Sequence, residues 1–128
     1  MIFLLDTHLL LWAASEPDRL SARATTIINE PTSGLMFSAA AIWEVAIKSR
    51  LGRTDFHADA RLLRRGLLEN GYAELAIEGD HTLAMLDLPD LHKDPFDRIQ
   101  VAQARVEGIV LLTTDQRVAD YGSPVELV

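Results

Sequence analysis

The feature that most constrains the fold is the uninterrupted apolar run Ile2–Leu5, which ends at Asp6. A second run of this kind, "IVLLTT" at residues 109–114, lies near the other end of the chain and is followed by Asp115. Such runs are typical of strands that are buried on both faces of a parallel sheet. Helical patterns alternate with them, and this order predicts a parallel α/β sheet covered on both sides.

The remaining elements follow from start and stop signals along the chain. Ser21 and Ser38 are good N-caps, and Gly52, Gly71 and Gly108 are good helix stops. Further strands are expected at residues 35–38, 72–77 and, at a sheet edge, 124–128. The expected helices are 7–14, 22–30, 39–52, 57–70, 79–86 and Pro95–Glu107.

Length and composition predict one soluble domain. A chain of 128 residues with 48% hydrophobic content can bury one core, so we expect a single domain over residues 1–128. The absence of cysteine removes disulfides, thiol catalysis and Cys-ligated zinc, and suits a reducing cytoplasm. The apolar start lacks a basic region and is interrupted by Asp6 and His8, so it is not a typical signal sequence. No run approaches the ~20 apolar residues of a membrane span.

The net charge of −7 argues at first sight against a polyanion partner. Half of the twelve basic residues, however, lie between Lys48 and Arg65. That segment could track phosphates, although a solvated helix face is an equally good interpretation.

Glu44 lies in an unexpected position on the helix predicted at 39–52. At 100° per residue it shares a stripe with Ala40, Ile47 and Leu51, which should face the core. A buried carboxylate needs a cation or hydrogen-bond donors. Lys48, one turn further on, offers a simple ion pair as the alternative to a functional role.

Two more acids, Asp94 and Asp97, begin the helix Pro95–Glu107. Asp94 is a good N-cap and Asp97 occupies the third helical position, so capping alone could explain both. Asp97 nevertheless lies over Val101 and Ala104, whereas Arg98 is on a different, solvated face. Asp97 is therefore predicted to point into the protein.

The placement of these acids predicts a metal site. Asp6, Glu44, Asp97 and Asp115 should all face one region, because parallel sheets present their sites beyond the carboxyl ends of the strands. Clustered carboxylates repel one another, and one or two Mg²⁺ or Mn²⁺ ions would compensate that charge. Such ions can activate water for attack on a phosphodiester.

Four blocks of sequence resemble, in order, the PIN-domain ribonucleases of the VapC toxin type. The blocks are "LLDTHLLLW", "SAAAIWEVAIK", "DPFDRIQVAQA" and "LLTTD". The resemblance implies a three-layer α/β/α fold with a mostly parallel sheet of four to five strands. It also implies a metal-dependent endoribonuclease that acts on RNA, has a VapB-like antitoxin as its partner and forms a homodimer.

The resemblance also assigns roles to particular residues. It carries the acidic positions of the family onto Asp6, Glu44, Asp97 and Asp115, with hydroxyl residues beside them at Thr7, Ser38 and Thr113. The hydroxyls would hydrogen-bond carboxylates or metal waters, although helix capping explains Ser38 equally well. The last block departs from the family pattern and leaves Asp120 as an extra candidate ligand, alongside Asp94. Candidate RNA-binding residues are Arg50, Arg53 and Arg98.

Two rival functions remain open. A PIN-fold protein could act as a non-catalytic binding module, and an Asp after the first strand also suits phosphatases of the haloacid-dehalogenase type. The latter expect a second Asp two residues on, where this chain has His8. The histidines at 8, 57, 81 and 92 lack metal-binding spacing, and Trp12 and Trp43 are predicted to be core residues.

Overall fold

Five short strands form the central sheet of the structure, a computed structural model that describes residues 1–128. The strands are β1 (Ile2–Leu5), β2 (Gly34–Ser38), β3 (Ala73–Leu75), β4 (Val110–Thr113) and β5 (Val125–Leu127). All pairs are parallel and their order is β3-β2-β1-β4-β5. The predicted parallel sheet, with residues 124–128 at one edge, is therefore confirmed.

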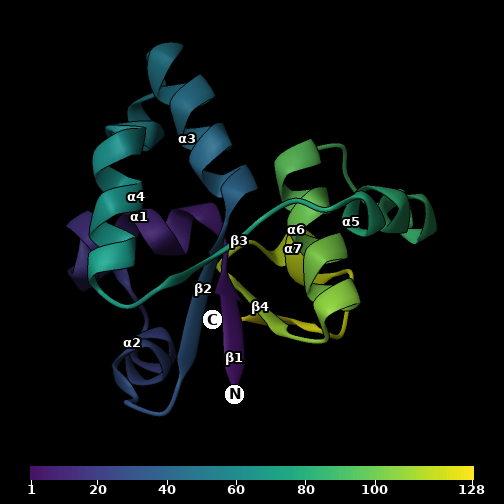
Figure 1. The fold of residues 1–128 in the computed structure, drawn as a ribbon, viewed down its shortest axis with the longest axis horizontal. Coiled ribbons are helices and arrows are strands. Elements are labelled where there is room, and N and C mark those ends of the chain that lie inside the picture. Colours follow the sequence, from purple (N-terminus) through teal and green to yellow (C-terminus); the bar gives the residue numbers. More distant parts are fainter.

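Helices cover both faces of this sheet. They are α1 (Thr7–Ser15), α2 (Ala22–Asn29), α3 (Ala39–Arg50), α4 (Ala60–Glu69), α5 (Gly79–Ala84), α6 (Pro95–Glu107) and α7 (Gln116–Ala119). In Figure 1, α1, α2 and α4 lie to the left of the sheet and α5, α6 and α7 to its right. This is the expected three-layer α/β/α arrangement. No helix has the length and apolar character needed to cross a membrane.

The strand β1 shows why the sheet is buried on both sides. Phe3 and Leu5 belong to the core cluster that includes residues of α1, α3 and α4. Leu4 points to the opposite face and packs with Val101 of α6 and Leu111 of β4. Apolar residues are therefore required from Phe3 to Leu5, where both faces of the strand are buried, whereas Ile2 at its start is 49% exposed.

Helix boundaries agree with the capping signals. Ser21, Ser38 and Asp94 are the N-caps of α2, α3 and α6, and each accepts hydrogen bonds from backbone N–H groups. Gly108 ends α6 with a φ of 68°, a left-handed conformation that favours glycine. The predicted bounds of α6 are those observed.

Several elements differ from the expectation. The helix predicted to begin at His57 begins at Ala60, because Asp59 caps it by accepting from the N–H groups of Arg61 and Leu62. The short helix α7 and the 3₁₀ turns at Pro17–Arg19 and Thr54–Phe56 were not predicted. Such segments of three or four residues are too short to show a helical period.

The end of α3 is also different from the prediction. Glu44 is buried as expected, but Ile47 is 36% and Leu51 74% exposed. Figure 1 shows α3 extending beyond the end of the sheet, so its last turns have no neighbouring layer on one side. The apolar stripe predicted for this helix therefore faces the core only along its first two turns.

The strand order places a switch point beside β1. The chain passes from β1 to β2 on one side and later adds β4 on the other side. Loops that leave neighbouring strands in opposite directions open a crevice at the carboxyl ends of the strands. Asp6 follows β1 at this point, and Thr113 is the last residue of β4.

Candidate metal centre

Asp6 is held at the switch point by two elements. It is the N-cap of α1, where Oδ1 accepts from the N–H of Leu9 at 3.0 Å. Its Oδ2 accepts from the Thr113 hydroxyl at 2.5 Å, which joins the ends of β1 and β4. Burial raises the pKa of Asp6, although the hydrogen bonds from Thr113 and Leu9 oppose that rise.

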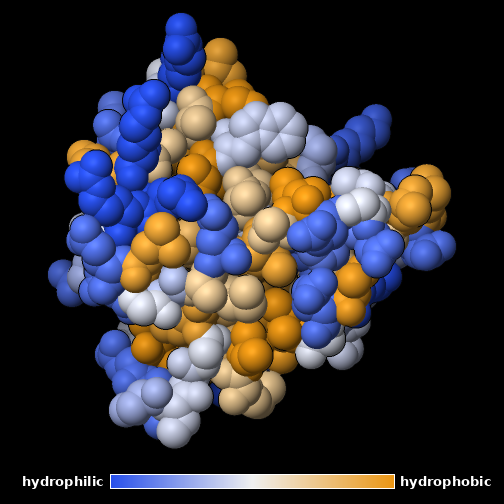
Figure 2. Space-filling model, in the orientation of Figure 1, coloured by the Kyte–Doolittle hydropathy of each residue, from blue (hydrophilic) through white to orange (hydrophobic).

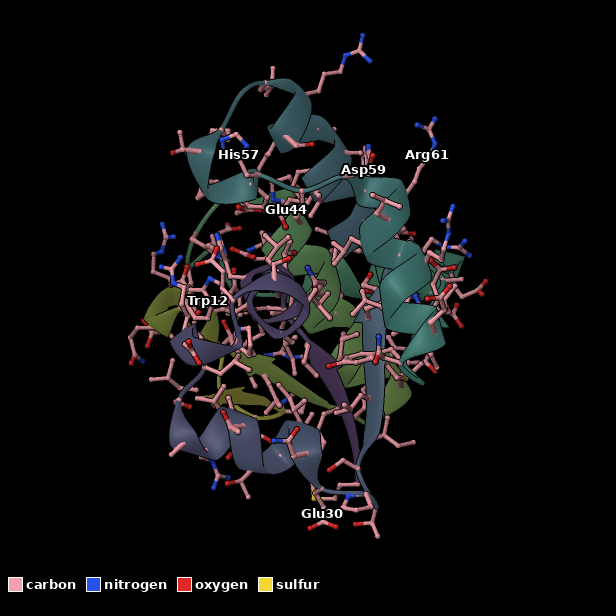
Figure 3. All side chains as sticks on the ribbon, turned by 90° about the vertical axis from the view of Figure 1, so that its left-hand side faces the viewer. Trp12, Glu30, Glu44, His57, Asp59 and Arg61 are labelled. Carbon is pink, nitrogen blue, oxygen red and sulfur yellow. The ribbon has the colours of Figure 1, made fainter.

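Glu44 approaches the same region from α3. Its side chain is only 3% exposed, and Figure 3 shows it among the side chains between α3 and α1. The Thr7 hydroxyl donates to Oε1 at 2.6 Å, and the Lys48 ammonium lies 2.5 Å from Oε2. The ion pair considered as an alternative for Glu44 is therefore present, and Lys48 also lies 3.7 Å from Asp94 Oδ2.

Asp94 and Asp97 have different environments, as the helical wheel indicated. Asp94 Oδ1 caps α6 by accepting from the N–H groups of Phe96 at 2.9 Å and Asp97 at 3.2 Å. The Asp97 side chain is 19% exposed, and its Oδ2 lies 3.2 Å from His92 Nε2. Val101 and Ala104, on the same stripe of α6, are fully buried.

The charges of these acids act on one another across separate elements. Burial, followed by the negative charge of Asp94, raises the pKa of Asp97 to about 6, with further contributions from Glu44 and Asp6. The hydrogen bond from His92 opposes that rise. Carboxylates from the end of β1, from α3 and from the start of α6 therefore share one electrostatic site.

Asp115 lies at the border of this group. It is the N-cap of α7, and both its oxygens contact the Arg117 guanidinium, Oδ2 at 2.9 Å. That cation lowers the pKa of Asp115. Its N–H donates to the Thr113 hydroxyl, so the backbone is tied to the Asp6 site while the carboxylate is occupied by Arg117. Asp120 is exposed at the far end of α7, where it accepts from Gln116, and the structure does not bring it to the other acids.

The three hydroxyl residues divide into two groups. Thr7 and Thr113 each donate to a carboxylate, as described above. Ser38 instead donates to Gln103 at 2.6 Å and caps α3 by accepting from the N–H of Ala40. The capping interpretation of Ser38 is the one that the structure supports, and its predicted contact with a carboxylate is absent.

The candidate RNA-binding arginines also differ in environment. Arg50 is exposed near the end of α3, and Arg53 is exposed but paired with Asp55 at 3.2 Å. Arg98 is not on a solvated face as predicted: its side chain is 13% exposed and donates to the Tyr121 hydroxyl and the Pro89 carbonyl. Both hydrogen bonds come from Nη1, so this nitrogen of the guanidinium is occupied within the protein.

Sequence patterns missed several residues around the acids. Helical spacing indicates Lys48 only as a partner of Glu44, yet its ammonium also lies 4.8 Å from the Phe56 ring centroid. His92 has no metal-binding spacing, and the only signal for it in the sequence is its position five residues before Asp97, an acid predicted to point into the protein. Trp43 is not in the core: it is 58% exposed and packs edge-on against Phe96.

Carboxylate oxygens are suitable ligands for a divalent ion, but the side chains as they are positioned do not form a complete coordination shell. No three His, Asp or Glu side chains lie close enough together to hold one ion. The amide oxygen Oε1 of Gln100 is the buried side-chain polar atom without a partner. Its amide nitrogen donates to Phe96 O and to Thr7, whose hydroxyl binds Glu44, so an acceptor is left free beside the site.

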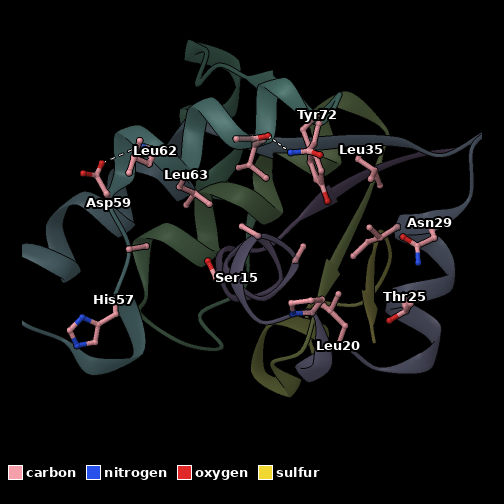
Figure 4. Close-up of a pocket in the computed structure, with 18 residues that line it drawn as sticks. Ser15, Leu20, Thr25, Asn29, Leu35, His57, Asp59, Leu62, Leu63 and Tyr72 are labelled. Atoms are coloured by element: carbon pink, nitrogen blue, oxygen red, sulfur yellow. Dashed lines mark hydrogen bonds between the residues drawn. The ribbon is translucent and has the colours of Figure 1, made fainter.

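Two hollows are present on the surface, and neither is lined by Asp6, Glu44 or Asp97. A groove of about 830 Å³ runs between α1, α2 and α4, and its lining includes Leu20, Ile28, Leu63 and Tyr72 (Figure 4). A smaller hollow of about 460 Å³ is mostly polar and reaches Asp115.

The family assignment agrees with this geometry. A family model for the PIN domain matches residues 3–123, and the chain therefore belongs to the PIN-domain family. This membership leaves the phosphatase interpretation without support. No curated protein sequence matched significantly.

Among solved structures, the fold is similar to toxins of VapBC systems. VapBC2 from Rickettsia felis, bound to a promoter DNA fragment, matches with a TM-score of 0.69 and 14% identity over 100% of this chain and 98% of that chain. VapC20 from Mycobacterium tuberculosis, a toxin that cleaves the sarcin-ricin loop, matches with a TM-score of 0.63 and 18% identity over 94% of this chain and 95% of that chain. VapBC-1 from nontypeable Haemophilus influenzae matches with a TM-score of 0.63 and 18% identity over 100% of this chain and 97% of that chain.

Proposed function

We propose that this protein is a cytoplasmic, Mg²⁺- or Mn²⁺-dependent endoribonuclease and the toxin of a VapBC-type pair. The observation that supports the proposal is that Asp6, after β1, and Glu44, on α3, lie near enough to Asp97 of α6 for their charges to raise its pKa. Burial is the main cause that raises the pKa of Asp97 to about 6, and the negative charges of Asp94, Glu44 and Asp6 add to it. A site that concentrates negative charge in this way favours cations.

One or two divalent ions would be held by Asp6, Glu44 and Asp97, with Asp115 as the proposed fourth ligand. When bound, such an ion activates water and neutralises charge on a phosphodiester. Thr113 and Thr7 fix the oxygens of Asp6 and Glu44 by donating to them. Gln100 Oε1 provides a free acceptor for a water beside Glu44. Glu44 becomes available as a ligand only when Lys48 moves away from it.

RNA is the proposed substrate. No side chain is needed as the nucleophile, and the exposed Arg50 and Arg53 would contact flanking phosphates through the backbone-directed interactions common in RNA binding. The activity of the structurally similar VapC20 on the sarcin-ricin loop supports RNA as the substrate class.

We propose an antitoxin as the protein partner. The groove between α1, α2 and α4 is lined by apolar side chains and is open to solvent, which suits the apolar face of a partner helix (Figure 4). A basic side chain of the same partner would neutralise the acids. Three of the similar structures contain toxin-antitoxin assemblies, which supports this proposal.

A homodimer is proposed on exposed apolar side chains of α3 and α5 and of the residues that directly follow these helices. Trp43, Leu51, Leu83 and Leu86 are between 58% and 82% exposed. In the orientation that Figures 1 and 2 share, apolar atoms are visible at the top, where α3 ends, and at the right, where α5 lies. Burial of such a surface between two copies would stabilise a dimer.

Cleavage of RNA by the purified protein tests the proposed function. The wild type should cut RNA in Mg²⁺ or Mn²⁺ and stop when EDTA is added. Asp6→Asn and Asp97→Asn should lose activity while retaining the circular dichroism of the wild type. Asp18→Asn, which changes an exposed acid on the Pro17–Arg19 turn, is the matched control and should keep full activity. Wild-type rates in a folded Asp97→Asn protein would refute the proposal.

The pair between Lys48 and Glu44 favours a second candidate, a PIN-fold binding module without catalysis. Lys48 already neutralises one acid, as a permanently metal-free site would require. Calorimetric titration separates the two candidates, because only the nuclease should bind Mg²⁺ or Mn²⁺.

A further inference from the structure

His92 connects the site to the body of the protein. Its imidazole side chain is 8% exposed and lies between two partners. Nε2 is 3.2 Å from Asp97 Oδ2, and Nδ1 is 2.8 Å from the hydroxyl of Tyr121, a buried residue that follows α7. The imidazole thus bridges the first turn of α6 and the chain after α7.

Arg98 favours one direction for each hydrogen bond of His92. A guanidinium can only donate, and Arg98 donates to the Tyr121 hydroxyl at 2.9 Å. The single hydroxyl hydrogen of Tyr121 then has one acceptor within reach, Nδ1 of His92. If Nδ1 accepts, the ring hydrogen is on Nε2, which donates to Asp97.

We propose that Arg98, Tyr121 and His92 form a hydrogen-bond relay of fixed direction, in which His92 is the positioning residue for the proposed metal ligand Asp97. This inference rests on the proposed function for the role of Asp97, but the direction of the relay is independent of it. His92 contacts Oδ2 of Asp97, and Oδ1 of Asp97 has no hydrogen bond from the chain. One carboxylate oxygen is therefore fixed while the other is free to coordinate.

Other contacts keep the relay rigid. The same nitrogen of Arg98, Nη1, also donates to the Pro89 carbonyl at 2.9 Å, so the segment before His92 is attached to α6. Arg105, two turns further along α6, donates to the Tyr121 carbonyl at 3.2 Å. Groups that orient a metal ligand in this way commonly affect metal affinity when they are removed.

The tautomer of His92 tests the direction of the relay in metal-free protein. Nitrogen-15 NMR should show that the neutral form of the ring carries its hydrogen on Nε2. In Tyr121→Phe that preference should weaken, because Nδ1 loses its donor. A neutral ring with its hydrogen on Nδ1 would overturn the relay.

Calorimetric titration with Mn²⁺ tests the positioning role. His92→Leu should bind Mn²⁺ about 10- to 100-fold more weakly than wild type. His92→Gln, whose amide can still donate to Asp97, should recover most of the affinity. His57→Leu, at an exposed histidine on another segment, is the control and should bind as wild type does.

Each result has a distinct meaning. Equal Mn²⁺ affinity in His92→Leu and wild type would overturn the positioning role, provided that both proteins retain the wild-type circular dichroism. Equal loss in His92→Leu and His92→Gln would also overturn it, since only the former lacks a donor. Absence of Mn²⁺ binding to the wild type would refute the proposed function and this role together, while the tautomer would still decide the direction of the relay.

Discussion

Two opposing electrostatic effects act on the carboxylate of Asp97. It belongs to the first turn of α6, where a negative charge is favourable next to the helix N-terminus. It is also largely buried near Asp94, Glu44 and Asp6, where that charge is unfavourable. The second effect is larger, because its pKa is raised from 3.8 to about 6.

That shift predicts how stability depends on pH without metal. An acid whose pKa is raised on folding binds more protons in the folded state, so stability falls as pH rises from about 4 to about 6. Asp97→Asn removes the effect and should be more stable than wild type at pH 8 by up to about 3 kcal/mol. Urea unfolding in EDTA at pH 4 and pH 8 should show this difference shrinking at the lower pH. A constant difference at both pH values would contradict the assigned ionisation.

The same residue predicts the pH dependence of metal binding. A protonated Asp97 is a poor ligand, so Mn²⁺ affinity should fall as pH decreases through about 6. In Asp94→Asn this fall should occur at lower pH, because one neighbouring negative charge is gone while the amide oxygen still caps α6. Calorimetric titrations with Mn²⁺ would measure affinity against pH for both proteins. They should cover pH 5 to pH 8 in roughly half-unit steps. Coincident curves for the two proteins would exclude the influence of Asp94.

At the scale of elements, Lys48 is the link between α3 and α6. Its ammonium contacts Glu44 on its own helix and Asp94 at the start of α6. Both Lys48 and Glu44 are largely buried, so their pairing compensates a charge that would otherwise be isolated. The two helices therefore depend on this cation when no metal is bound.

Lys48→Met should destabilise the metal-free protein by on the order of 3 kcal/mol, because Glu44 would remain as an uncompensated buried charge. The double variant Lys48→Met with Glu44→Gln should recover most of that loss. Thermal unfolding in EDTA measures both effects. Mn²⁺ should stabilise Lys48→Met more than wild type, since the ion then replaces the missing cation. Equal stabilisation of the two proteins would contradict competition between Lys48 and metal.

At the scale of the whole molecule, the sequence was most informative where one physical effect dominates. Runs such as Ile2–Leu5 predicted the buried strands, because a central parallel strand requires apolar residues on both faces. The bounds of α6 followed from Asp94 and Gly108, since caps act locally. The burial of Glu44 and the inward direction of Asp97 were also predictable from helical periodicity.

Other features depend on contacts between distant segments. The relay through His92 joins residues 29 positions apart, and no local pattern encodes it. The exposure of Trp43 and Leu51 depends on how far α3 extends beyond the sheet, which helical periodicity does not reveal. The separation of Asp115 from the other acids results from Arg117 on α7, a helix too short to predict.

The central claim is that Asp6, Glu44 and Asp97 bind a divalent ion at the carboxyl ends of β1 and β4. The most direct test is a crystal of the protein soaked in Mn²⁺, with anomalous scattering recorded near the manganese edge. We expect an anomalous peak within coordination distance of carboxylate oxygens from these residues, about 2.0–2.6 Å for hard cations, with Lys48 displaced from Glu44. A fully soaked crystal with no peak among these acids, and with the pair between Lys48 and Glu44 intact, would contradict the claim.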